Sequence, residues 1–181
     1  MKETVYYLTG MGGRLGAGLG QALLGRGFEV AGRELIGEFR SLDFQNQLDL
    51  IAEDLQTHFW DEGAFVIANS FGAYLLLHAL TQLPPYPGSI LLLSPIVGAF
   101  SNEESQMSFI PPRADKLLKL AQDGTFPTPM NCEAHVGAED WQSNPENVMN
   151  FFSLLEVGVT VVPEAGHALP KDYVGSLLDS K

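Results

Sequence analysis

The segment Ala64-Phe65-Val66-Ile67-Ala68-Asn69-Ser70-Phe71-Gly72-Ala73-Tyr74-Leu75-Leu76-Leu77-His78-Ala79 contains two apolar runs separated only by Asn69-Ser70-Phe71-Gly72. The first run, Phe65 to Ala68, has the length of a buried strand. The second, Tyr74 to Leu80, is too long for a strand and indicates a buried helix. Because the chain passes from strand to helix within so few residues, we expect a sharp bend with positive φ at Ser70.

A bend this tight needs small residues two positions before and two positions after it, because a Cβ atom there would collide with the turn. Ala68 and Gly72 occupy these positions. The bend would expose the Ser70 hydroxyl beside backbone N–H groups and the amino terminus of a helix. Few structural requirements place a serine there, so the pattern favours a reactive hydroxyl.

The pattern Ala68-x-Ser70-x-Gly72 resembles the nucleophile elbow of the α/β-hydrolase superfamily, which is usually written G-x-S-x-G. Ala68 stands where the first glycine is usual and adds one methyl group, which is the mildest steric departure. The strand expected before the motif and the helix expected after it supply the context that the motif requires.

Composition indicates one globular domain. The chain has 181 residues, of which 45% are hydrophobic and 18% charged, enough for a single full core. The net charge of −12 would repel nucleic acid and anionic membranes, and it favours neutral acyl substrates of modest size over polyanions. One cysteine cannot form an intramolecular disulfide, so nothing argues for an oxidising compartment.

The apolar run within residues 1–8 is too short for a signal peptide, and no window reaches the length of a membrane span. We therefore expect a cytoplasmic protein with no membrane association and no nucleic-acid partner. The oligomeric state is left open.

Strands and helices are expected to alternate along the chain. Strands are expected at Val5–Leu8, Phe28–Val30 or as far as Leu35, Phe65–Ala68, Ser89–Leu93, Cys132–Val136 and Val159–Val162. Helices are expected at Leu15–Leu24, Asp43–Phe59, Tyr74–Leu80, Ala114–Gln122, Pro145–Glu156 and Tyr173–Leu178. This alternation predicts a parallel sheet covered by helices on both faces, an α/β fold.

The resemblance implies a minimal α/β-hydrolase fold, a three-layer α/β/α sandwich in which the family's usual first two strands are missing. Its six-stranded parallel sheet would have the order 2-1-3-4-5-6. Residues 1–181 would form one domain, with a short lid-like insertion at about 96–129.

A serine hydroxyl needs a base to take its proton, and an imidazole suits this task because its pKa lies near neutrality. Four histidines are present, of which only His167 follows the final expected strand in a loop. His58 and His78 lie in expected helices and His135 in an expected strand, where packing or surface roles are the better interpretation. The resemblance makes Ser70 the nucleophile and His167 the base.

In the family, the triad acid follows the strand that corresponds here to Cys132–Val136, usually in a G-x-x-D pattern. Gly137-Ala138-Glu139-Asp140 places Asp140 at that position, with Glu139 as the adjacent alternative. Two solvated loop acids on an acidic protein are the structural alternative.

An oxyanion hole needs backbone N–H donors, each worth about 3 to 4 kcal/mol in the transition state. By resemblance, the donors would be the N–H of Phe71 and that of Met11, in the loop after the first strand. Thr9 stands where many family members carry histidine.

Two other classes remain open. The segment Gly10-Met11-Gly12-Gly13-Arg14-Leu15-Gly16 invites a dinucleotide-binding interpretation, but Leu15 breaks the G-x-G-x-x-G pattern. A hydrolase fold can also serve as a non-catalytic binding protein. Cys132 and His135 lack further metal ligands nearby, so we expect no metal and no cofactor.

These observations favour a serine hydrolase that cleaves a carboxylic ester or thioester of a small acyl substrate; an amidase or peptidase is the alternative. A substrate pocket is expected from apolar residues of the insertion and beside the acid, although several of these would equally pack on the core. The pocket candidates are Phe100, Met107, Phe109 and Trp141, with Ile110 and Phe126 as further apolar residues of the insertion.

Overall fold

A single parallel sheet runs through the molecule, and the computed structural model describes residues 3–181 of the chain. The strands of this sheet lie in the order β2-β1-β3-β4-β7-β8, so the predicted order is confirmed once the short β5–β6 hairpin is set aside. The strands are β1 (Thr4–Met11), β2 (Glu29–Leu35), β3 (Phe65–Asn69), β4 (Ser89–Leu93), β5 (Phe100–Asn102), β6 (Met107–Phe109), β7 (Asn131–Gly137) and β8 (Gly158–Val162). The helices are α1 (Leu19–Gly25), α2 (Gly37–Ser41), α3 (Phe44–His58), α4 (Phe71–Leu80), α5 (Lys116–Gln122), α6 (Pro145–Leu154) and α7 (Lys171–Asp179).

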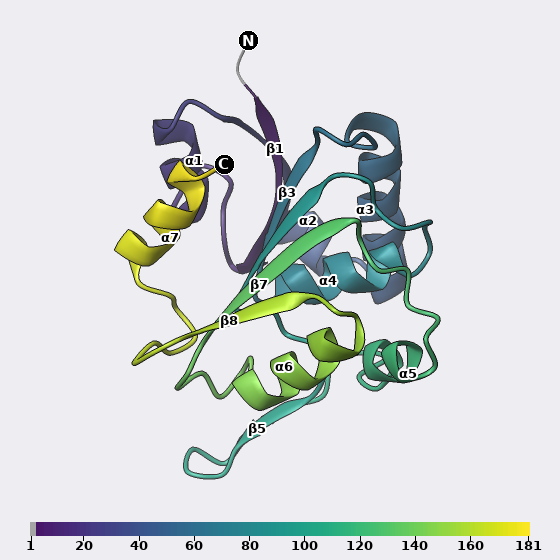
Figure 1. Cartoon of the computed structure of the whole chain (residues 1–181), viewed down its shortest axis with the longest axis vertical. Coiled ribbons are helices and arrows are strands. Elements are labelled where there is room, and N and C mark those ends of the chain that lie inside the picture. The colour runs from purple at the N-terminus through teal and green to yellow at the C-terminus, as the bar shows by residue number, and fades with distance from the viewer. Residues whose placement is uncertain (1–2) are drawn as a thin grey trace.

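Helices cover both faces of the sheet, as the alternating pattern predicts (Figure 1). Successive strand residues point to opposite faces. In β1, Tyr6 and Leu8 belong to the core under α3, α4, α5 and α6, whereas Val5 and Tyr7 pack toward α1 and α7. The first of these cores is much the larger, so the α1–α7 layer is thin.

Helix starts follow from their capping residues. Asp43 accepts a hydrogen bond from Asn46 N at 2.9 Å and caps α3. Asn144 accepts from Glu146 N and Asn147 N, and Pro145 occupies the first turn of α6. Both starts were expected from the sequence.

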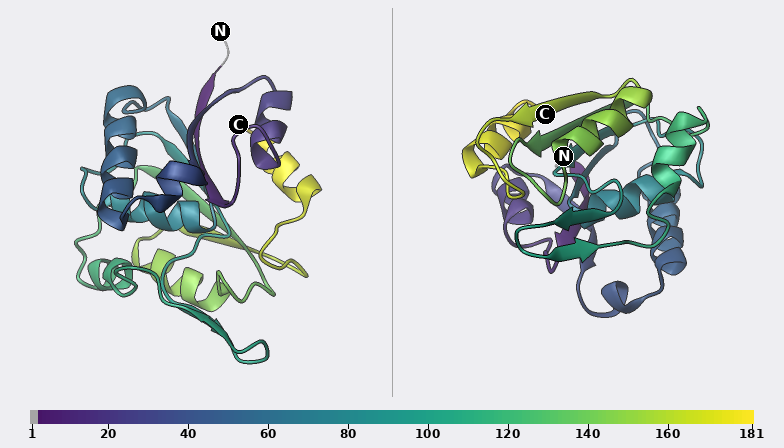
Figure 2. Two further views of the ribbon diagram at one scale, coloured as in Figure 1. Left: turned by 180° about the vertical axis from the view of Figure 1, so that it is seen from behind. Right: turned by 90° about the horizontal axis from the view of Figure 1, so that it is seen from below.

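Two features of the structure were not expected. Residues 100–109 form an antiparallel hairpin, which projects from the body of the molecule in Figure 2. Its strands are three residues long, too short to give a recognisable alternation of apolar residues. Helix α1 begins at Leu19 rather than Leu15, because Gly12 and Gly18 have φ of 74° and 53° and keep the preceding segment in a loop.

No helix within residues 3–181 is long and apolar enough to cross a membrane.

His78 is fully buried in α4 between aromatic rings. Its ring centroid lies 4.4 Å from that of Tyr74 and 5.2 Å from that of Phe44. Neither of its ring nitrogens has a hydrogen-bond partner among the described residues. Burial lowers the pKa of His78 to about 3, with Lys116 and Arg113 adding to the effect.

We predict that His78 makes the fold acid-sensitive. The pKa of His78 in the folded protein lies below its value near 6.5 in the unfolded chain. The stability that depends on neutral His78 is therefore complete above pH 6.5 and is lost as the pH falls toward 3. The free energy of unfolding, measured in urea, should therefore fall between pH 7 and pH 4.5 in the natural chain. In His78→Leu this fall should be smaller by about 2 kcal/mol. His58→Leu, at an exposed position on α3, is the control. Equal pH dependence in His78→Leu and the natural chain would contradict the assignment.

Candidate active site

Ser70 lies at the junction of β3 and α4 with φ of 54° and ψ of −120°, the bend that the sequence predicts. Backbone hydrogen bonds to β4 and to the segment after it fix this residue. Its N–H donates to Leu93 O at 3.0 Å, and its carbonyl accepts from Ile96 N at 3.3 Å. A serine with positive φ is strained, and the flanking strands hold it in place. The bend turns the Ser70 side chain toward the loops that follow the strands.

Gly72 has no room for a side chain. A Cβ atom there would lie 2.3 Å from Thr9 O and 2.6 Å from Leu8 O, so α4 crosses the end of β1 at backbone contact. Ala68, in contrast, is fully buried within the larger core, which accommodates its methyl group. Of the two flanking small residues, only the one after Ser70 must be glycine.

Three side chains from distant loops form a continuous hydrogen-bonded chain. Ser70 Oγ lies 2.7 Å from His167 Nε2, and His167 Nδ1 lies 2.8 Å from Asp140 Oδ2. Ser70 follows β3, Asp140 follows β7 and His167 follows β8. Because the strands are parallel, the loops at their carboxyl ends meet at one edge of the sheet.

The structure brings Asp140 rather than Glu139 to His167. The Asp140 side chain is fully buried, and its Oδ1 accepts hydrogen bonds from Gln142 N and Ser143 N, each at 2.9 Å. These two N–H groups and the imidazole hold the Asp140 carboxyl group in one orientation. Glu139 is exposed to solvent.

The two residues expected to supply oxyanion-hole N–H groups are Phe71, which directly follows Ser70, and Met11, which lines the same cavity as Ser70. Phe71 is the first residue of α4, so its N–H has no partner within the helix. Gly12 N donates to Leu35 O in β2, and successive N–H groups of a strand point to opposite sides. The N–H of Met11 therefore points away from β2 and toward the end of β3. A Cβ atom on Gly10 would lie 3.3 Å from Ser70 Cβ, which shows how closely this loop passes the serine.

The Thr9 side chain fixes the backbone at the carboxyl end of β1 from inside the fold. Its fully buried hydroxyl accepts from Leu35 N at 3.0 Å and lies 2.9 Å from Gly10 O. This side chain takes the place of a regular strand hydrogen bond where the β1–β2 register shifts. Thr9, which stands where many family members carry histidine, thus fixes the backbone at the end of β1 through its hydroxyl group.

Two further serines support the site and were missed by sequence reasoning. Ser94 Oγ donates to His167 O at 2.7 Å, and Ser143 Oγ donates to Ser94 O. Ser94 has φ of 46° and follows β4, the strand next to β3. Its place after a neighbouring strand was the available signal, but nothing in the sequence showed that its hydroxyl would reach the His167 backbone.

The other histidines and the cysteine lie away from Ser70. His135 Nδ1 lies 2.6 Å from the Tyr173 hydroxyl and anchors α7 to β7. Burial raises the pKa of the Cys132 thiol to about 12, as in a packed core cysteine. Within residues 3–181, no three His, Cys, Asp or Glu side chains are grouped so that they could hold a metal ion. Helix α1 starts beyond Gly16, so the glycine-rich segment does not open a helix as a dinucleotide fingerprint does.

A cavity of about 800 Å³ reaches Ser70 and His167 and extends between α1 and α7. The cavity is lined by residues from the end of β1, from α1, from the ends of β3 and β4, and from α7 and the loop before it. The lining residues are Gly10, Met11, Gly18, Leu19, Gln21, Ala22, Arg26, Asn69, Ser70, Leu93, Ser94, Gln142, His167, Ala168, Leu169, Lys171, Val174 and Gly175.

The pocket candidates from the sequence lie elsewhere. Phe100, Phe109 and Trp141 form an aromatic cluster, with ring centroids 5.3 Å and 5.7 Å apart. Phe109 also contacts Phe71, at 6.0 Å. The cluster therefore adjoins the site through Phe71, but its members do not line the cavity. Met107 is 57% exposed on the hairpin and is also outside the cavity lining.

Two more apolar residues of the insertion have other surroundings. Ile110 is 78% exposed, and Phe126 is buried against Phe151 at 5.7 Å. Phe126 packs on the core, which was the structural alternative for these residues.

The strand order, the bend after β3 and the loops after β7 and β8 together define the α/β-hydrolase fold, and the chain has this fold. The product of the ydeN gene of Bacillus subtilis is similar in structure, with a TM-score of 0.66 at 15% identity over 99% of this chain and 100% of that one. A monoacylglycerol lipase from Paleococcus ferrophilus gives a TM-score of 0.63 at 16% identity, over 98% of this chain and 94% of that one.

An uncharacterised protein from Bacillus cereus gives a TM-score of 0.65 at 16% identity over 99% of this chain. The chain spans 57% of the length of that protein. No protein-family model and no curated protein sequence matches the chain.

We predict that Gly72→Ala destabilises the fold by more than about 2 kcal/mol, because the methyl group would overlap two backbone carbonyl oxygens that cannot move aside. Urea unfolding measures this directly. Gly16→Ala is the matched control, since a Cβ atom there meets nothing within 4 Å. Equal stability of the two variants would show that the backbone of α4 at Gly72 is not in close contact with the end of β1.

Proposed function

We propose that the protein is a serine hydrolase that cleaves a carboxylic ester or thioester of a small acyl substrate through an acyl-serine intermediate. The observation that carries the proposal is the hydrogen-bonded chain from Ser70 through His167 to Asp140, set at a strained bend. The similar structures include one described as a monoacylglycerol lipase, which supports the same class of reaction.

The orientation of His167 supports a role as general base. With Nδ1–H donating to the Asp140 carboxylate, Nε2 carries the lone pair that faces Ser70 Oγ at 2.7 Å. As Oγ attacks the substrate carbonyl carbon, Nε2 takes the hydroxyl proton and the carbonyl oxygen becomes an oxyanion. The buried carboxylate stabilises the imidazolium ion that forms.

The N–H groups of Met11 and Phe71 would stabilise the oxyanion. Phe71 follows Ser70 at the start of α4, and Met11 lines the cavity that contains Ser70. When the tetrahedral intermediate collapses, His167 gives its proton to the leaving oxygen or sulfur, and the acyl group remains on Ser70. A water molecule, deprotonated by His167, then attacks the acyl-serine and releases the acid.

We predict that a fluorophosphonate probe labels the protein at Ser70. Such probes react with a serine whose hydroxyl is activated by a base. Labelling, mapped by mass spectrometry, should vanish in Ser70→Ala and slow by about a hundredfold or more in His167→Ala. Absence of labelling in well-folded protein would overturn the proposal and favour a binding role for the fold.

We predict different effects for the two adjacent acids. Asp140→Asn should lower kcat/KM for p-nitrophenyl esters by about 10²- to 10⁴-fold, because the amide no longer fixes the tautomer of His167. Glu139→Gln removes an equal charge from an exposed side chain and should stay within about twofold of the natural protein. Similar losses in both variants would mean that charge near the loop matters and the Asp140–His167 contact does not. An ester panel of increasing acyl length would define the acyl preference.

A further inference from the structure

The cavity that begins at Ser70 carries a charge opposite to that of the whole chain. Its described lining includes Arg26 and Lys171 and contains no aspartate or glutamate. The chain as a whole has 22 acidic and only 10 basic residues. At physiological ionic strength, charges farther than about 8 Å are largely screened, so the charged groups at the cavity affect a bound ligand more than the net charge of the chain does.

Lys171 lines the same cavity as Ser70 and His167. It is the first residue of α7, four positions after His167 in the sequence. Among the described residues, no carboxylate lies within 4.0 Å of its ammonium group. Its charge is therefore available to a ligand in the cavity.

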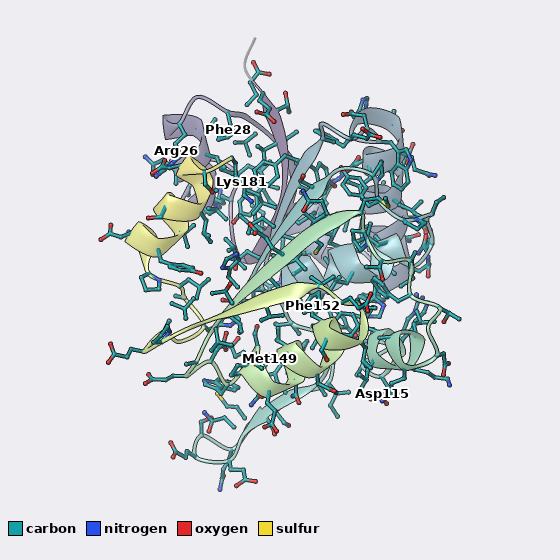
Figure 3. The ribbon with its side chains drawn as sticks, viewed as in Figure 1. Arg26, Phe28, Asp115, Met149, Phe152 and Lys181 are labelled. Carbon is teal, nitrogen blue, oxygen red and sulfur yellow. The ribbon has the colours of Figure 1, made fainter. Side chains whose placement is uncertain are left out.

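Arg26 follows the last residue of α1 and lies next to α7, as Figure 3 shows. Its Nε donates to Asp179 Oδ1 at 2.7 Å and its Nη1 to Ala22 O at 3.2 Å. A Cβ atom on Gly175 would lie 2.9 Å from Nη2, so the missing side chain leaves space for the guanidinium over α7. Arg26 follows Gly18 by eight residues, which is about 12 Å along α1 at about 1.5 Å per residue.

The wall between the two cations is mainly apolar. Leu19 and Ala22 of α1, Val174 of α7, and Leu93 and Leu169 from the adjoining segments all line the cavity. A ligand that fits this arrangement has a hydrocarbon portion and an anionic group.

We propose that the substrate is an anionic ester, with a carboxylate on the portion that lies between α1 and α7 and that Arg26 and Lys171 recognise. This inference rests on the proposed hydrolase function and names its substrate class. It differs from the expectation of a neutral substrate, which the net charge and the short insertion favoured. The carboxylate can belong to the acyl portion or to the alcohol portion.

Two matched substrate pairs separate these sources. The mono-p-nitrophenyl ester of suberic acid and its terminal amide differ only in the charge at the end of the acyl chain. The pair 4-acetoxybenzoate and 4-acetoxybenzamide differs in the charge on the alcohol. We expect kcat/KM to favour the carboxylate by about tenfold or more in one pair, as charge-assisted hydrogen bonds allow.

Substitutions then test the two cations. The preference for the carboxylate should fall by about tenfold in Arg26→Met or Lys171→Met. It should persist in Lys119→Met, which removes one positive charge from an exposed position on α5. Asp179→Asn is the sharper control for Arg26, because it breaks the same α1–α7 ion pair but should keep or raise the preference.

The inference fails if neither pair shows a preference in protein that is labelled at Ser70, or if the preference survives both Arg26→Met and Lys171→Met. Binding to Ser70→Ala, measured by calorimetry with the suberate ester, the 4-acetoxybenzoate ester and their amides, gives a readout that needs no hydrolysis. Tighter binding of either carboxylate supports the anion site even if the proposed activity is absent. Equal or undetectable binding within both pairs, in a protein that also hydrolyses none of them, overturns it.

Discussion

The backbone bend at Ser70 is the constraint on which the rest of the structure depends. Positive φ at a serine is unfavourable by itself, and three strands hold it in place. Leu93 and Ile96 hydrogen-bond to Ser70 on the β4 side, while Gly72 lies against the carbonyl groups at the end of β1. The bend therefore ties β1, β3 and β4 together at one edge of the sheet. The end of β1, which carries Met11, and the loops that carry Asp140 and His167 meet at the same edge of the sheet.

The two faces of the sheet differ in how much apolar surface they bury and in whether they border the cavity. The α3–α4 face buries most of the apolar side chains, including the fully buried Tyr74 and Leu76, and supplies most of the hydrophobic stability. The α1–α7 face is covered by two short helices that leave space between them. Because the site opens into this thinner layer, its cavity can acquire cations and apolar residues without disturbing the main core. The proposed recognition of an anion depends on the residues that line the cavity and not on the net charge of the whole chain.

The parallel sheet could be predicted from the alternation of strands and helices, whereas its strand order and the roles of the site residues were implied by the resemblance to a known fold. The structure has the expected strand order and brings the Ser70, His167 and Asp140 side chains together. The apolar strand before Ser70, the glycine after it and the loop around His167 each indicate their roles within a few residues. The cavity could not be predicted in this way. Arg26 and Lys171 are 145 positions apart, and only packing of α1 on α7 brings them to one wall. The hairpin at residues 100–109 was likewise missed, and its aromatic side chains pack beside Phe71 instead of lining the cavity.

The site also has an order of assembly along the chain. All residues that fix the backbone of Ser70 lie between Leu8 and Ile96, whereas His167 lies 97 positions after the serine. During synthesis the chain emerges with its amino terminus first. A nascent chain that has reached only β7 holds every residue that fixes the backbone of Ser70, yet it lacks His167. The serine would thus stay unreactive until β8 and the loop that follows it have been added.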